Sequence, residues 1–148
     1  MPVDDGVEVL KLRGDAEILE VYLEEAKDEA SFIVRLHKDW MLNPEDENTV
    51  ENIHRALHTI KGSGRLVGAY KISEFAWDYE QLLNRIIDKS VPVERAVINA
   101  IGHAGKALTE LVHELKTSKK PSSDIPYLRG LARALAEFRT EELLLDRT

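Results

Sequence analysis

The chain contains no cysteine among its 148 residues. Disulfide bonds, thiolate catalysis and cysteine-ligated metal sites are therefore excluded. No apolar run approaches the roughly 20 residues that a membrane-spanning helix needs, and no secretory signal is visible. These absences lead us to expect a cytoplasmic protein, or a cytoplasmic part of a longer one, that has no membrane partner.

Positive charge is also scarce, because 20 lysines and arginines face 27 acidic residues and leave a formal net charge of −7 at pH 7. A protein that binds the phosphate backbone of a nucleic acid needs a basic surface, so we expect no nucleic-acid partner. The composition is otherwise that of a folded globular protein, with 43% hydrophobic and 32% charged residues. A chain of this length is expected to form one domain with a proper core.

Apolar residues recur at three- and four-residue spacing along most of the chain, which predicts an all-α protein. We expect residues 1–14 to be a loose lead-in and residues 15–117 to form the core domain. Four amphipathic helices are predicted in this domain, over about 15–43, 44–68, 70–89 and 93–117. Because the connections between them are short, neighbouring helices should be antiparallel, as in an up-down four-helix bundle.

A linker is predicted at residues 118–124, where lysine, proline and serine interrupt the apolar period. Beyond it, residues 125–148 contain a fifth amphipathic helix, which we expect to reach about residue 145. Its apolar stripe consists of Tyr127, Leu128, Leu131, Leu135 and Phe138. The stripe needs a surface to cover, and the sequence leaves open whether the bundle or a partner provides it.

The second predicted helix carries an unusual cluster at residues 57–68, Leu-His-Thr-Ile-Lys-Gly-Ser-Gly-Arg-Leu-Val-Gly. Glycine in a helix interior costs about 0.5–1 kcal/mol relative to alanine, so two glycines within one turn require a reason. Gly64 falls on the apolar stripe, where we expect close helix packing. Gly62 lies on the other face, where any side chain should crowd the neighbouring histidine. Gly68 is expected to be a left-handed C-terminal cap.

His58 is the candidate reactive residue of this cluster. At ~100° per residue, it projects roughly 140° from the centre of the apolar stripe and should face water or a partner. Lys61, Gly62 and Arg65 lie one and two turns further along the same face. An imidazole beside two cations and a missing side chain suits a site that briefly carries a phosphoryl group. The cations offset the charge of the dianion, and the glycine leaves room for another protein.

The cluster resembles the signature of histidine-containing phosphotransfer (HPt) domains: histidine, any residue, an aliphatic residue, lysine, glycine, two small residues and a later aliphatic–glycine pair. The resemblance covers about residues 15–117. The flanking stretches 23–26 and 80–85 look most like the HPt domains of chemotaxis-type kinases, especially the large kinases that control type IV pili. It implies that His58 accepts a phosphoryl group and passes it to an aspartate of a response-regulator receiver domain.

The resemblance further implies a donor, which is the ATP-binding catalytic domain of a histidine kinase or a phosphorylated receiver. The chain shows no glycine-rich nucleotide loop, so we expect a phosphocarrier that is not a self-sufficient enzyme. No cofactor is expected.

Roles for individual residues also follow from the resemblance. Glu80 matches a glutamate that hydrogen-bonds one imidazole nitrogen of the phosphoacceptor and leaves the other nitrogen free to attack. Lys61 is expected to steady the phosphoryl oxygens. The face that docks the receiver or the kinase is expected to contain Gly62, Arg65, His54 and Arg55. Trp77 stands where many chemotaxis relatives carry a second histidine, so we expect a simpler site without a second proton-handling group.

Two other interpretations stay open. The chain could be a helical interaction or dimerisation module with a vestigial histidine. It could also bind a metal, because His54 and His58 are spaced i and i+4, and Glu-x-x-His occurs at 51–54 and 110–113, as in di-iron bundles. Such bundles project their ligands inward, whereas a helical wheel points His54 and His113 away from the apolar stripes. We therefore expect no metal site.

Overall fold

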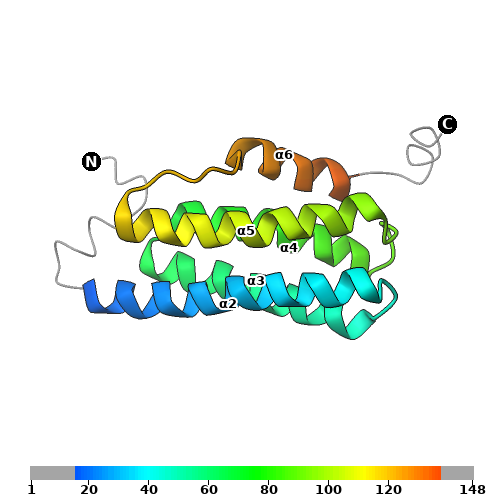
Figure 1. Ribbon diagram of the computed structural model, residues 1–148, viewed down its shortest axis with the longest axis horizontal. Coiled ribbons are helices and arrows are strands. Elements are labelled where there is room, and N and C mark those ends of the chain that lie inside the picture. The colour runs from blue at the N-terminus through cyan, green and yellow to red at the C-terminus, as the bar shows by residue number, and fades with distance from the viewer. Residues whose placement is uncertain (1–15, 138–148) are drawn as a thin grey trace.

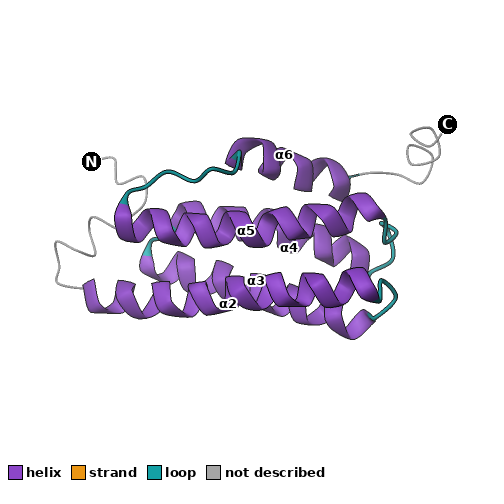
Figure 2. Ribbon diagram, viewed as in Figure 1, coloured by secondary structure: helices purple, strands orange, loops and turns teal. Residues whose placement is uncertain are grey.

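The computed structural model describes residues 16–137. This part of the chain contains five helices and no strand (Figure 1, Figure 2). The helices are α2 (Ala16–Leu42), α3 (Glu47–Val67), α4 (Tyr70–Ile87), α5 (Arg95–Thr117) and α6 (Ile125–Ala136). The predicted all-α architecture, a four-helix bundle with an additional C-terminal helix, is confirmed.

Helices α2 to α5 form the bundle, and each short loop reverses the direction of the chain (Figure 1). Helix α2 packs against α3 and α5, while α4 packs against the same two helices from the other side. Helix α6 lies outside the bundle against α4 and α5. Helix α4 is therefore covered on one side by α3 and on another by α6.

The helix ends differ from the predicted bounds by a few residues. Helix α3 begins at Glu47 and not at residue 44, because the Asp46 carboxylate caps it and accepts hydrogen bonds from the backbone N–H groups of the first turn. Gly68 ends α3 with φ of 81°, which confirms the predicted left-handed cap. Helix α4 ends two residues before 89, and α5 begins two residues after 93.

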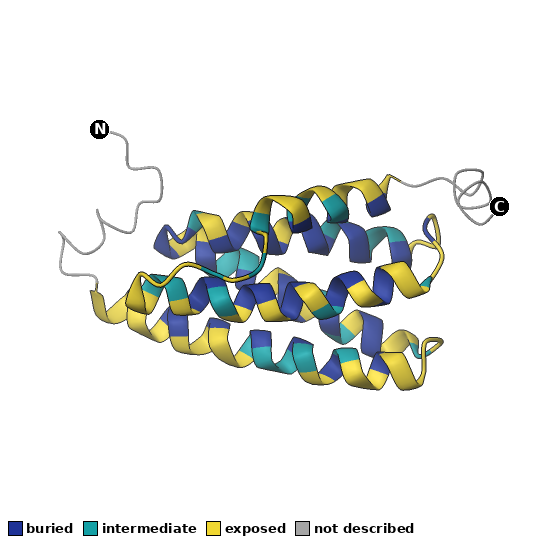
Figure 3. Cartoon of the chain, turned by 45° about the horizontal axis from the view of Figure 1, so that its top comes forward, coloured by how far each residue is buried: buried dark blue, intermediate teal, exposed yellow. Residues whose placement is uncertain are grey.

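The core is made by the inward faces of all five helices (Figure 3). Its largest fully buried side chains are Trp40, Tyr79, Phe75, Ile33, Ile53, Leu57, Ile60, Ile72, Leu82, Leu83, Ile101 and Leu108. They come from α2 to α5 at helical spacing, so the periodicity of apolar residues in the sequence correctly predicts the core. None of the described helices is long and apolar enough to cross a membrane.

Helix α6 covers the bundle itself, which answers the question that the sequence left open. Its buried residues are Leu128, Ala132, Leu135 and Ala136. Tyr127 was predicted in this stripe but is 61% exposed. The inner face is instead completed by two alanines, whose small side chains permit a close approach to the bundle. Phe138 and the predicted end near residue 145 lie outside the described residues.

Polar contacts fix α6 on α4 as well. The Tyr79 hydroxyl donates to the Leu128 carbonyl oxygen over 2.7 Å. Arg129 Nε lies 2.5 Å from Asp78 Oδ2, and Arg133 Nε lies 3.5 Å from Oδ1 of the same carboxylate. The Asp78 side chain is only 1% exposed, so these two cations compensate a buried charge.

Candidate functional site

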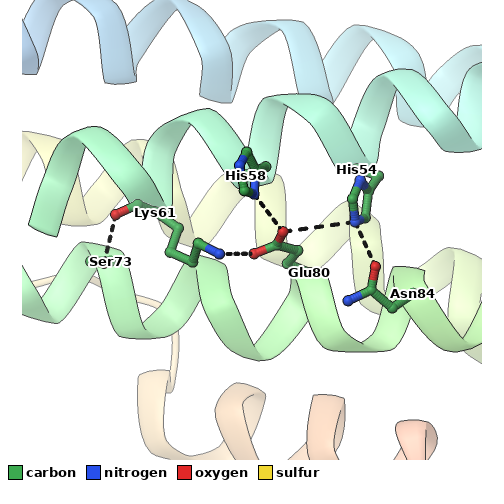
Figure 4. Close-up of polar contacts among 6 residues, drawn as sticks. All are labelled: His54, His58, Lys61, Ser73, Glu80 and Asn84. Carbon is green, nitrogen blue, oxygen red and sulfur yellow. Dashed lines mark hydrogen bonds and ion pairs between the residues drawn. The ribbon is translucent and has the colours of Figure 1, made fainter.

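His58 lies in the middle of α3 on the outer surface of the bundle. Its side chain is 63% exposed, which agrees with the direction given by the helical wheel. The close-up in Figure 4 shows that the surrounding polar side chains come from two helices, with His54 and Lys61 on α3 and Glu80 and Asn84 on α4. The site is therefore built on the α3–α4 interface.

Glu80 is the centre of this site. Its Oε2 lies 2.7 Å from His58 Nδ1, and its Oε1 lies 2.9 Å from Lys61 Nζ (Figure 4). An ionised carboxylate only accepts hydrogen bonds, so Nδ1 of His58 carries the proton and donates it. The Nε2 atom of the same ring then keeps its lone pair. The arrangement leaves this nitrogen as a nucleophile on an exposed side chain.

The charge state of Glu80 follows from its surroundings. The side chain is 6% exposed. Burial alone would raise its pKa, but the hydrogen bonds from Lys61 and His58, together with their charges, outweigh burial and hold the pKa of Glu80 below its usual range. Glu80 is therefore ionised at neutral pH, as the hydrogen bond to His58 requires.

His54 brings a second imidazole to the same carboxylate. Its Nε2 lies 2.6 Å from Asn84 Oδ1 and 3.8 Å from Glu80 Oε2 (Figure 4). The side chain is 27% exposed and faces α4, although we expected it on the docking face. Trp77 is exposed and takes no part in this cluster. The position of Trp77 thus carries no second histidine, whereas α3 brings the imidazole of His54 to the same carboxylate from the turn before His58. The expectation of a site without a second proton-handling group stays a prediction.

The two glycines of the cluster differ in their surroundings. A β-carbon at Gly64 would lie 2.8 Å from Tyr22 Oη and 3.3 Å from Ser73 Cβ, so the predicted close packing is confirmed. A β-carbon at Gly62 would have no atom within 4 Å. The expected crowding around Gly62 is therefore absent within the chain itself, and the open space there is available to another molecule.

Side chains from two neighbouring helices brace α3 next to the site. The Ser73 hydroxyl of α4 donates to the Lys61 carbonyl oxygen over 2.8 Å, and the Tyr22 hydroxyl of α2 donates to the Ile60 carbonyl oxygen over 3.4 Å. These contacts lie within one turn of His58. The Ser73 contact holds α3 against α4, and hence the imidazole near Glu80, while the Tyr22 contact holds α3 against α2.

The remaining site candidates lie on the outer face of α3. Arg65 and Arg55 are both exposed, and Arg55 Nη1 donates to Asn52 Oδ1 over 3.0 Å. Their docking role stays a prediction. Among residues 16–137, no group of three or more histidine and acidic side chains is arranged to hold a metal ion. The Glu110 carboxylate of one Glu-x-x-His motif binds Ser122 and Ser123 instead.

The fold and this site define a class of protein: a helical bundle in which a buried carboxylate on one helix forms a hydrogen bond with an exposed histidine on the preceding helix. The Hpt domain family matches residues 17–118. The chain belongs to this family.

Curated relatives point to one kind of protein. The chemotaxis protein CheA of Treponema pallidum is 26% identical over 157 residues, covering 92% of this chain and 18% of the relative. The chemotaxis protein CheA of Borreliella burgdorferi is 26% identical over 124 residues, covering 84% of this chain and 14% of the relative. The chain thus spans less than a fifth of the length of these relatives.

A solved structure shares the fold. It is the phosphorylated P1 domain of CheA3 in complex with CheY6 from R. sphaeroides, with a TM-score of 0.71 and 19% identity. The similarity covers 81% of this chain and 95% of the P1 domain. The arrangement of helices in this chain is therefore that of a known phosphorylated domain.

Proposed function

We propose that this chain is a histidine phosphotransfer module. His58 accepts a phosphoryl group on Nε2 and passes it to an aspartate of a receiver domain. The observation that carries the proposal is the 2.7 Å hydrogen bond between His58 Nδ1 and Glu80 Oε2. It fixes the proton on one ring nitrogen and leaves the other nitrogen free on an exposed side chain.

The transfer takes place in two steps, and each step forms one bond to phosphorus and breaks another. In the first step, the Nε2 lone pair forms a bond to phosphorus while the bond from phosphorus to an oxygen of the donor breaks. The ring gains positive charge and keeps its proton on Nδ1, where the ionised Glu80 stabilises it. In the second step, a carboxylate oxygen of the receiver attacks phosphorus, and the N–P electron pair returns to Nε2. Because Nδ1 is still protonated, the leaving group is a neutral imidazole.

Lys61 contributes through Glu80. Its ion pair with Oε1 keeps the carboxylate charged and in place while Oε2 binds His58. The role that the resemblance implies, contact with the phosphoryl oxygens, stays a prediction beside this one.

The partners follow from the surface and from the relatives. CheA3 P1 is described in complex with CheY6, and we extend this kind of partner to the present chain. The proposed docking face combines Gly62, Arg55 and Arg65 with exposed apolar side chains of α2 and α3, namely Ile18, Val21 and Leu66.

The donor is proposed to be the ATP-binding domain of a chemotaxis-type histidine kinase, because the curated relatives are CheA proteins. A cytoplasmic location and a role in type IV pilus control belong to this proposal on the resemblance alone.

An intact-mass phosphotransfer assay tests the proposal. The chain is mixed with a CheA-type kinase domain and ATP, or with phosphorylated receiver domains. We expect a gain of one acid-labile phosphoryl group that His58→Gln abolishes and that His113→Gln, a change of another exposed histidine, leaves intact. A folded chain that takes no label from any donor would contradict the proposal and favour a helical interaction module with a vestigial histidine.

A further inference from the structure

The geometry points to His54 as a positioning residue for His58. We propose that it acts through Glu80, with Asn84 holding its ring in place, so that the phosphoacceptor keeps the protonation state that transfer requires. This inference rests on the proposed function, since it assigns a further residue to the same site. It also replaces the docking role that the sequence predicts for His54.

The hydrogen bond to Asn84 sets the orientation of the His54 ring. The Asn84 amide oxygen lies 2.6 Å from Nε2 and can only accept, so Nε2 of His54 carries a proton. This donor edge of the ring is also the edge that faces Glu80, at 3.8 Å from Oε2. That distance is too long for a hydrogen bond, and the interaction is electrostatic. The positive edge of His54 therefore faces the oxygen that His58 uses.

Three groups with N–H donors thus surround one buried carboxylate. Lys61 occupies Oε1, His58 occupies Oε2, and His54 lies beside Oε2 from the preceding turn of α3. With only 6% of its side chain exposed, Glu80 has little water to compensate for the loss of a neighbouring positive edge. Removing His54 would leave Oε2 with a single partner and release Asn84. The carboxylate would then be held by Lys61 and His58 alone and would keep its orientation toward His58 for less of the time.

His54 also borders the His58 ring directly. The two ring centroids are 6.5 Å apart and the planes differ by 11°, which is within the range of parallel aromatic pairs. His58 itself is 63% exposed, so few neighbours restrict its rotation. A parallel ring one turn away restricts rotation of the His58 ring into orientations that break the hydrogen bond between Nδ1 and Glu80. Both contacts therefore favour the tautomer with its proton on Nδ1.

The test uses His54→Leu, which removes the donor, and His54→Gln, which restores an N–H at a similar distance from the backbone. His113→Leu is the matched control, because His113 is an exposed histidine on α5. Two quantities are measured: the tautomer of His58, from its ring ¹⁵N chemical shifts, and the dependence of phosphotransfer rate on donor concentration. Asn84→Ala provides a second route to the same loss if His54→Leu does not fold.

We expect His54→Leu and Asn84→Ala to increase the share of the His58 tautomer protonated on Nε2. The maximal transfer rate should fall roughly two- to tenfold, the effect of one neutral hydrogen bond, with an unchanged half-saturating donor concentration. His54→Gln should restore both, and His113→Leu should change neither.

An unchanged tautomer and an unchanged maximal rate in folded His54→Leu would overturn the inference. A higher half-saturating concentration with the same maximal rate would also overturn it and return His54 to the docking face. If the wild-type chain takes no label on His58, the proposed function fails, while the ¹⁵N shifts still decide whether His54 positions the ring.

Discussion

Lys61 and Glu80 form an ion pair across the α3–α4 interface, with 2.9 Å between Nζ and Oε1. In this structure the lysine of the HPt signature therefore pairs with the carboxylate that is hydrogen-bonded to the histidine. Lys61→Met should lower the free energy of unfolding by about 1–3 kcal/mol, because it leaves a buried carboxylate with one charged partner fewer. Urea denaturation at pH 7 measures this change.

A double-mutant cycle with Glu80→Gln separates the ion pair from other effects of the lysine. The loss from Lys61→Met should be smaller in the Glu80→Gln background. Equal losses in both backgrounds would show that Lys61 stabilises the chain by other contacts.

Glu80→Gln should slow phosphotransfer strongly while His58 stays exposed. The amide oxygen can still accept from Nδ1, but the negative charge that stabilises the positive ring is lost. A hydrogen bond to a charged group contributes about 1.5–3 kcal/mol, which corresponds to roughly 10- to 150-fold in rate. Single-turnover transfer from a phosphorylated receiver measures the effect. A rate within twofold of wild type would contradict the proposed role of Glu80.

The bundle should become less stable as the pH falls from 7 to 3, because the contribution of Glu80 is lost. Its pKa is lowered in the folded chain, so the unfolded chain binds this proton more readily. The stabilising contribution is therefore present above the usual carboxyl pKa of about 4.3 and is lost as pH falls through the lowered value. Urea titrations of wild type and Glu80→Gln from pH 7 to pH 3 test this. The difference between the two should shrink below pH 4, and a constant difference would refute the linkage.

The two glycines of the cluster should respond oppositely to alanine. Gly64→Ala places a methyl group 2.8 Å from the buried Tyr22 hydroxyl and should cost about 1–3 kcal/mol. Gly62→Ala meets open space and should stabilise the helix by up to about 1 kcal/mol. Thermal unfolding of the pair tests the contrast. Similar shifts in both variants would mean that the packing around Gly64 is looser than its contacts indicate.

Residues within one helix were predictable, and contacts between helices were less so. The apolar period and the cap at Gly68 identify α3 and place His58 outward, since both depend only on local spacing. Glu80 was identified through the resemblance to HPt domains, because nothing in the sequence around it shows that it meets α3. His54 and Asn84 meet only when α3 and α4 pack in one register, which no single-helix pattern determines.

The attachment of α6 illustrates the same limit. Asp78 lies two residues before Glu80, and its burial under Arg129 and Arg133 gives no signal in the sequence of α4. The amphipathic pattern predicts that α6 needs a surface, and the spacing alone includes Tyr127 in the stripe. Two alanines, and not Tyr127, complete the inner face of α6. They do so because α6 packs closely against the bundle, and this closeness depends on the side chains of both surfaces.

The exposure of His58 has a consequence for the timing of a relay. With 63% of the side chain exposed, an approaching protein can reach Nε2 without any opening of the bundle. The rate at which partners meet His58 then depends on collisions and on long-range charge, while the chemical step depends on Glu80. A chain of net charge −7 repels an acidic partner, and added salt should increase their encounter rate. In such a relay, partner abundance and ionic surroundings set how often the site is visited, and an exposed phosphohistidine is open to partners and to hydrolysing water alike.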